Sequence, residues 1–216
     1  MKKKYIILSI LLSLISIAYT LVIMKVDVRA IGPNESTVGL ASINGWFKDL
    51  IGSNMDVYKI TEYFGYAIFL IVGVYGLIGL CQLIKRKSLF KVDRELICLG
   101  ELYVLMLAVY VIFDKVAINY RPILIDGVLE PSYPSSHTIL AICIAISSLI
   151  ISKKYFRTFW IYLITFVTMF LLTVILVGRV MSGVHWLTDI GGGIIISATL
   201  LMYFYTVLKT KKSKKA

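Results

Sequence analysis

The chain has only two histidines, His137 and His185, and each stands in a short polar segment between long apolar ones. The polar segments cover residues 114–138 and 178–189. A histidine can attack phosphorus as a nucleophile, or it can move a proton as a general acid or base. The two segments are therefore the part of the sequence in which chemistry is expected.

The same two segments hold groups that suit a phosphate. Arg121 and Arg179 carry planar forks of donors that match phosphate oxygens, and Lys115 adds a compact positive charge. Ser135 and Ser136 follow a proline at the expected start of a helix, where free backbone N–H groups and the helix dipole favour an anion. These five residues predict a phosphate-binding site.

His185 and Asp189 are four residues apart and are expected to share one face of a helix. The carboxylate would then accept a hydrogen bond from one ring nitrogen and leave the other free to attack phosphorus. His137 would protonate the departing oxygen. The alternative is a histidine with a purely structural hydrogen bond, which the combination of two histidines, three cations and a paired aspartate disfavours.

We expect no metal and no cofactor. Neither segment has an HExxH or DxD pattern, and nucleotide-binding glycine motifs are absent. The glycine run at residues 191–193 favours close helix packing. The cysteines Cys81, Cys98 and Cys143 lie in apolar stretches and are interpreted as buried hydrophobic residues.

The elements that position these residues are predicted to be membrane helices. The chain is 59% hydrophobic and 16% charged, which excludes intrinsic disorder, a disulfide scaffold and a large soluble multidomain enzyme. A spanning helix needs about 20 apolar residues. Six segments meet or approach this length, the fourth being the shortest, and we expect an all-α, polytopic bundle that forms a single membrane-embedded domain over residues 1–216. The six are residues 5–24, 60–84, 96–113, 138–152, 158–177 and 186–206.

The distribution of basic residues predicts the orientation. Of the 23 Lys and Arg residues, 16 fall at one set of helix ends, which includes both termini and the basic tail at 209–216. Because cytoplasmic loops are enriched in Lys and Arg, both termini are assigned to the cytoplasm and the two histidine segments to the extracytoplasmic face of the cell membrane. The net charge of +11 then reports topology, and no nucleic-acid partner is expected. Alternatively, residues 1–24 are a cleaved signal peptide, which leaves five spans.

The longest polar stretch, residues 25–59, is expected outside the membrane. Within it, apolar residues recur at helical spacing and predict an amphipathic helix on the outer leaflet. These residues are Leu40, Ile43, Phe47, Leu50 and Ile51. The helix is either a packing cap over the bundle or a lid that guides a lipid substrate.

The motifs resemble those of the type 2 phosphatidic acid phosphatase superfamily. Its members are integral membrane lipid phosphatases that are related in fold to vanadium haloperoxidases. That family has a Lys, six residues, then Arg-Pro; a Pro-Ser-Gly-His; and a Ser-Arg, five residues, His, three residues, Asp. The third motif is met in spacing by Arg179, His185 and Asp189, and the order of all three motifs agrees.

The chain departs from the family pattern at three positions. Five residues, rather than the six of the family, separate Lys115 from Arg121, so that Asp114 stands at the family spacing. Ser136 replaces the family glycine, and Gly178 replaces the family serine.

The resemblance implies an enzyme in which His185 forms a phosphohistidine, Asp189 orients His185, and His137 serves as acid and then base. It implies that the phosphoryl oxygens are held by Arg121, Arg179, Ser135, the Ser136 amide and Lys115.

The expected activity is metal-independent hydrolysis of the terminal phosphate of a lipid phosphate or diphosphate, with undecaprenyl diphosphate as the first candidate. Phosphatidylglycerophosphate and phosphatidic acid are alternative substrates. A non-catalytic lipid-phosphate binder or transporter is the alternative from another class, and vanadate-dependent haloperoxidase activity conflicts with six spans. The bilayer and the lipid substrate are the expected partners, and no obligate protein partner is evident.

Overall fold

The bundle of long helices dominates the structure. The computed structural model describes residues 2–210, with side chains from residue 3 onward. Among these residues, six helices are long and apolar enough to cross a membrane, which confirms the predicted all-α, multi-pass architecture. They are α1 (Lys2–Lys25), α3 (Met55–Arg86), α4 (Arg94–Lys115), α5 (Ser136–Tyr155), α6 (Thr158–Met181) and α7 (Leu187–Thr210). The expected tail beyond Thr210 lies outside the described residues.

Five of the six helices cover their predicted apolar segments completely, and α7 begins one residue inside its segment, at Leu187. All six extend past the segment at one end or both. The largest extension is at the start of α3, five residues before the apolar segment begins. There the Asn54 side chain caps the helix by accepting hydrogen bonds from the amides of Asp56 at 3.1 Å and Val57 at 3.0 Å. This cap adds a polar first turn to α3, at the end of the bundle that carries the predicted site.

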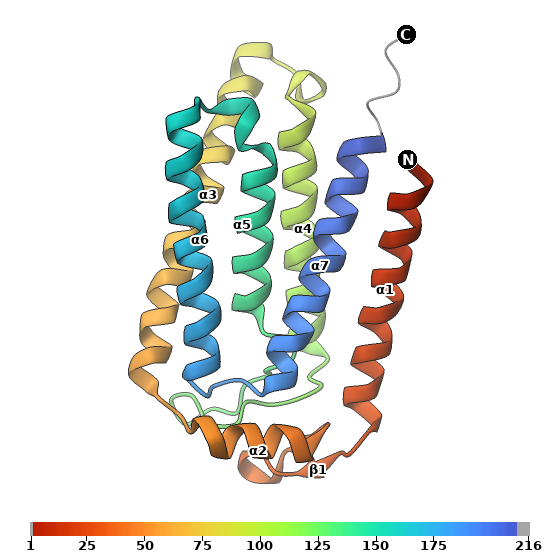
Figure 1. The fold of residues 1–216 in the computed structure, drawn as a ribbon, viewed down its shortest axis with the longest axis vertical. Coiled ribbons are helices and arrows are strands. Elements are labelled where there is room, and N and C mark those ends of the chain that lie inside the picture. The colour runs from red at the N-terminus through yellow and green to blue at the C-terminus, as the bar shows by residue number, and fades with distance from the viewer. Residues whose placement is uncertain (1, 211–216) are drawn as a thin grey trace.

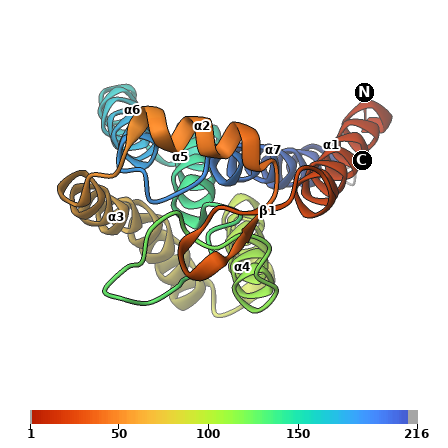
Figure 2. The same cartoon turned by 90° about the horizontal axis from the view of Figure 1, so that it is seen from below.

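Helix α5 lies inside the bundle, and α1 lies at its edge (Figures 1 and 2). α5 packs against α6 and α7, whereas α1 packs against α7. Hydroxyl pairs join α1 to its neighbours at Ser9–Thr206, Ser16–Thr199 and Thr20–Tyr133, with oxygen–oxygen distances of 2.8–3.0 Å. Hydrogen bonds of this kind are a main source of helix association in an apolar solvent.

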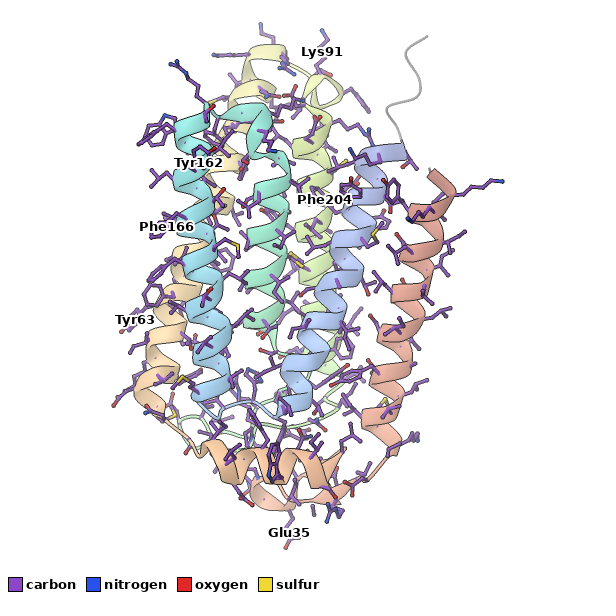
Figure 3. The ribbon with its side chains drawn as sticks, viewed as in Figure 1. Glu35, Tyr63, Lys91, Tyr162, Phe166 and Phe204 are labelled. Carbon is purple, nitrogen blue, oxygen red and sulfur yellow. The ribbon has the colours of Figure 1, made fainter. Side chains whose placement is uncertain are left out.

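Aromatic residues show which surface faces lipid. Phe204 points into the bundle and is 1% exposed, whereas Tyr63, Tyr162 and Phe166 point away from it on α3 and α6 and are 70–73% exposed (Figure 3). Large exposed apolar side chains over a whole helical surface are expected when the solvent is the hydrocarbon of a bilayer.

Both described ends of the chain lie at one end of the bundle, and the longer connecting segments lie at the other (Figure 1). The short strands β1 (Arg29–Ala30) and β2 (Thr37–Val38) pair antiparallel around the 3₁₀ turn η1 (Pro33–Glu35). The helix α2 (Ala41–Ile51) then lies across this end, beside the ends of α5, α6 and α7 (Figure 2).

Helix α2 is fixed to α7 by one buried side chain. Asn44 is fully buried, and its Nδ2 donates to the Gly39 carbonyl at 2.8 Å and to Thr188 Oγ1 at 2.9 Å. Its Oδ1 accepts from the Thr188 amide at 3.2 Å and so caps the start of α7. This bonding supports the interpretation of the amphipathic segment as a packing cap over the bundle rather than as a lid that guides a lipid substrate.

An ion-pair network joins α3, α4 and α5 at the end that holds the termini, next to the turn η2 (Leu89–Lys91). The Asp93 carboxylate accepts from Arg86 Nη1 at 2.8 Å and from Gln82 Nε2 at 3.1 Å, and it lies 3.2 Å from Lys154 Nζ. Burial raises the pKa of Asp93, but hydrogen bonds from these three residues outweigh burial and lower the pKa to about 2.

Candidate active site

The predicted site residues gather where the starts of α5 and α7 meet the end of α6. The Ser135 amide donates to the Asp189 carbonyl at 3.0 Å, which ties the two helix starts together. Gly193 allows this approach, because a Cβ on it would lie 2.9 Å from the Thr138 side chain and 3.1 Å from the Ser135 carbonyl oxygen. The glycine run thus serves close helix packing, as predicted.

His185 lies in the loop between α6 and α7 rather than on a helix, because α7 begins at Leu187. The prediction that His185 and Asp189 share a helical face is therefore wrong. The loop still places His185 Nδ1 3.6 Å from Asp189 Oδ2, but this distance is too long for the expected hydrogen bond. Gly183 shapes this loop with a φ of +63°, and a Cβ there would lie 1.9 Å from the carbonyl oxygen of Gly52.

Asp189 is fully buried in the first turn of α7 and is held on both oxygens. Its Oδ2 accepts from the Trp186 amide at 2.9 Å, and its Oδ1 accepts from Asn119 Nδ2 at 3.2 Å. Asn119 in turn accepts from the Gly39 amide at 3.2 Å. These bonds fix the carboxylate beside His185.

The two arginines converge on one aromatic ring. Arg179, fully buried at the end of α6, has its Cζ 5.0 Å from the centre of the Tyr58 ring, and the Arg121 Cζ is 5.9 Å from the same centre. Each guanidinium also contacts a carboxylate: Arg179 Nη2 pairs with Glu62 Oε1, and Arg121 Nε lies 2.9 Å from Glu130 Oε2.

His137 stands in the first turn of α5, with its Nε2 3.3 Å from Glu62 Oε1. Ser136 and His137 line one pocket, which is described below. Ser135 is fully buried, and its Oγ accepts a hydrogen bond from Thr138 Oγ1 at 3.0 Å. Seven of the eight predicted site residues therefore lie in or next to one cluster.

Lys115 is the predicted site residue that the structure does not bring to the cluster. Its side chain is 78% exposed and pairs with Asp114 Oδ2 at 3.3 Å. Asp114 instead lines the pocket, and it is the residue at the family's lysine spacing. A one-residue shift on a helix rotates a side chain by about 100°, which explains the exchange.

Several buried side-chain nitrogens at this site have no hydrogen-bond partner among the described residues. They are Arg121 Nη1, Arg179 Nε and Nη1, His137 Nδ1, and both ring nitrogens of His185. Buried polar atoms in proteins are almost always paired, and unpaired ones call for an explanation. Guanidinium N–H groups beside imidazole nitrogens suit an anion with several oxygens.

The environment of His185 favours its neutral form. Burial, followed by the positive charges of Arg121 and Arg179, lowers the pKa of His185 well below its usual value of 6.5. A neutral imidazole keeps a lone pair, which a nucleophile needs. Within the described chain, no group of three or more His, Cys, Asp or Glu side chains is placed to hold a metal ion.

A pocket of about 770 Å³ connects the polar cluster to the space between α3 and α4. These two helices contact each other little. The polar end of the pocket includes Arg121, His137 and His185, and its apolar part includes Phe69 and Leu107. A second cavity of about 330 Å³ lies deeper between α3 and α4, and both cavities are bordered by Val72 and Tyr103.

A multi-pass helical bundle with a buried cluster of nitrogens that suit an anion at one end indicates a class of membrane protein that binds lipid phosphates. Residues 70–213 match the PAP2 superfamily, which is more than half of the chain, and the chain belongs to that superfamily. It is therefore a membrane lipid phosphate phosphatase, a phosphoric ester hydrolase, and the resemblance stated from the motifs is confirmed.

One solved structure shares the fold. The chain is similar to the first transmembrane PAP2 type phosphatidylglycerolphosphate phosphatase from Bacillus subtilis, with 15% sequence identity and a TM-score of 0.63. The similarity covers 96% of this chain and 98% of that one. A comparison with curated proteins found no match in sequence.

Sequence reasoning missed the contribution of α3 to the site. Tyr58 and Glu62 both precede residue 70, where the superfamily match begins. Glu62 had a detectable signal, because an ionisable residue inside an apolar segment is costly and marks a functional position by default. Asn119 had no such signal in its polar loop.

Proposed function

We propose that the protein hydrolyses the terminal phosphate of a lipid diphosphate, with undecaprenyl diphosphate as the first candidate, through a phosphohistidine on His185. The observation that carries this proposal is the cluster of unpaired buried nitrogens on Arg121, Arg179, His137 and His185. The arginine N–H groups suit the oxygens of one phosphoryl group. Arg121, His137 and His185 line the polar end of the apolar pocket.

The reaction has two steps. His185 Nε2 attacks phosphorus and forms a P–N bond while the P–O bond to the lipid breaks, and His137 gives a proton to the departing oxygen. His137 then takes a proton from water, whose oxygen forms a P–O bond with the phosphohistidine while the P–N bond breaks, so that inorganic phosphate leaves and His185 is regenerated. Asp189 holds the His185 ring, and the two guanidiniums stabilise the charge on the transferring group.

The pockets between α3 and α4 support a long lipid tail. The residues of α3 that border them run from Tyr58 to Leu83. At 1.5 Å per residue this path is roughly 37 Å long, which is longer than the hydrocarbon core of about 30 Å is thick. A polyprenyl chain fits such a path. Phosphatidylglycerophosphate, named by the similar Bacillus subtilis structure, is the alternative substrate, with phosphatidic acid next.

The test is phosphate release by the detergent-purified protein in EDTA, over a panel of undecaprenyl diphosphate, phosphatidylglycerophosphate and phosphatidic acid. We expect the highest kcat/KM with undecaprenyl diphosphate, and we expect His185→Ala to abolish release. Arg179→Ala removes a candidate phosphate ligand and should lower phosphate release. Lys59→Ala, which removes an exposed cation at the start of α3, is its matched control. Full activity in both His185→Ala and His137→Ala would overturn the mechanism.

The non-catalytic lipid-phosphate binder or transporter that the sequence kept open as an alternative is not proposed, because the chain belongs to the PAP2 superfamily of phosphatases. The position of Lys115 outside the cluster means that the other cations of the site hold the phosphate without it.

We also propose that the site faces the extracytoplasmic side of the cell membrane. Glu35 and Lys91 lie at opposite ends of the bundle (Figure 3). In a protein without its native cysteines, Glu35→Cys should react with a membrane-impermeant maleimide added to intact cells, and Lys91→Cys should react only after lysis. The reverse pattern would contradict the orientation.

A further inference from the structure

Both candidate phosphate-binding arginines are paired with glutamates that line the same pocket. Arg179 Nη2 pairs with Glu62 Oε1, and Arg121 Nε lies 2.9 Å from Glu130 Oε2. The two glutamates come from different parts of the chain, α3 and the loop between α4 and α5.

Glu62 stands where a phosphate oxygen would be expected. The same oxygen, Oε1, contacts Arg179 and lies 3.3 Å from His137 Nε2. The His137 ring also packs against α3 at Gly65, where a Cβ would lie 3.0 Å from its Cδ2. α3 therefore brings a carboxylate oxygen between a candidate phosphate ligand and the candidate general acid.

The pairing has a physical reason. Arg179 is fully buried and Arg121 is 8% exposed, and a buried cation without a counter-ion is strongly destabilising. Glu62 and Glu130 supply two negative charges to two positive ones. Their side chains are 24% and 39% exposed, so both carboxylates can turn away from the arginines when another anion takes their place.

We propose that Glu62 and Glu130 are placeholder carboxylates that exchange with the substrate phosphoryl group and determine which phosphate can enter. The inference rests on the proposed function, in which Arg121 and Arg179 hold the phosphoryl oxygens. A terminal phosphate carries about −1.5 to −2 charge and replaces both carboxylates. A phosphodiester headgroup carries a single negative charge and replaces only one. The glutamates thus exclude the phosphodiester lipids of the surrounding bilayer.

Glu62→Gln and Glu130→Gln test the exchange, because glutamine keeps the side-chain shape and removes the charge. With less competition for the arginines, the inhibition constant of orthovanadate should fall at least threefold in each variant. Vesicles of phosphatidylglycerol, a phosphodiester lipid, should become competitive inhibitors of both variants and not of the wild type. Glu35→Gln removes the same charge from an exposed loop at the same end of the bundle and should change neither value.

The outcomes separate this inference from the proposed function. If Arg179→Ala still binds orthovanadate as the wild type does, the proposed function fails. If Arg179→Ala loses binding while both glutamine variants keep the wild-type inhibition constant, only the placeholder role is overturned. Glu130 lies in a loop, so Glu130→Gln keeps the test decisive if the Glu62→Gln protein does not fold.

Discussion

Replacing Asn44 by alanine removes the buried amide that joins α2 to the start of α7. Three hydrogen bonds are lost, at 2.8 Å to Gly39, 2.9 Å to Thr188 Oγ1 and 3.2 Å from the Thr188 amide. Each is worth about 1 kcal/mol in a buried site, so the free energy of unfolding should fall by about 3 kcal/mol. In a chain of this size that corresponds to a drop in Tm of about 6–12 °C.

Cys98 and Cys143 are buried in the folded state as predicted, whereas the prediction that Cys81 is buried is wrong, because its side chain is exposed on α3. Thermal unfolding of the detergent-purified protein can therefore be followed with a thiol-reactive dye in a Cys81→Ser background. Asp49→Ala, at an exposed position of the same helix, is the matched control and should change Tm little. Phosphatase activity should fall with the loss of the cap, since Thr188 adjoins Asp189. A Tm shift for Asn44→Ala no larger than that of Asp49→Ala would refute the fixed cap.

Three further predictions concern single groups. In the His137→Asn protein, His185 is the one remaining histidine. Because the pKa of His185 is lowered, ¹³C NMR should find its imidazole neutral from about pH 8 down to about pH 5.5. A titration midpoint near 6.5 would contradict this. Asp93→Asn should destabilise the protein by about 1 kcal/mol, equally at pH 7 and pH 5. The Asp93 carboxylate contributes fully above its ordinary pKa of 3.8, and that contribution is lost as the pH falls from there through about 2. A difference that shrinks between pH 7 and pH 5 would therefore be inconsistent. Gly178→Ser should cost about 1–3 kcal/mol, because its Cβ would lie 2.2 Å from Thr61 Cγ2, and Thr61→Ser should restore the loss; failure of this rescue would refute the packing argument.

The spans and the histidine cluster were predictable because each depends on a strong local signal. Long apolar segments must be helices in a bilayer, and alternate polar loops must meet at the same side. His137, His185, Arg121 and Arg179 therefore had to gather at one end of the bundle. Their exact partners were less accessible: His185 lies in a loop, and its contact with Asp189 depends on the turn at Gly183.

The wall formed by α3 could not be predicted, because it depends on how one helix is rotated and how closely it approaches α6. Gly178, where the family has serine, lets Thr61 pack against α6. Glu62 follows Thr61 and so reaches Arg179. Nothing in an apolar segment reports which face turns toward a neighbouring helix when nearly all positions are apolar. The prediction that Lys115 joins the site failed for a similar reason, since a shift of one residue along the helix decides where its side chain points.

The covalent step is the central claim, and trapping it is the most direct test. The protein is mixed in EDTA with a lipid diphosphate that carries ³²P in its terminal phosphate, quenched within milliseconds, and digested for mass spectrometry. The account predicts acid-labile label on His185 in the wild type and none in His185→Ala. Label on another residue, or undiminished phosphate release by His185→Ala, would contradict it.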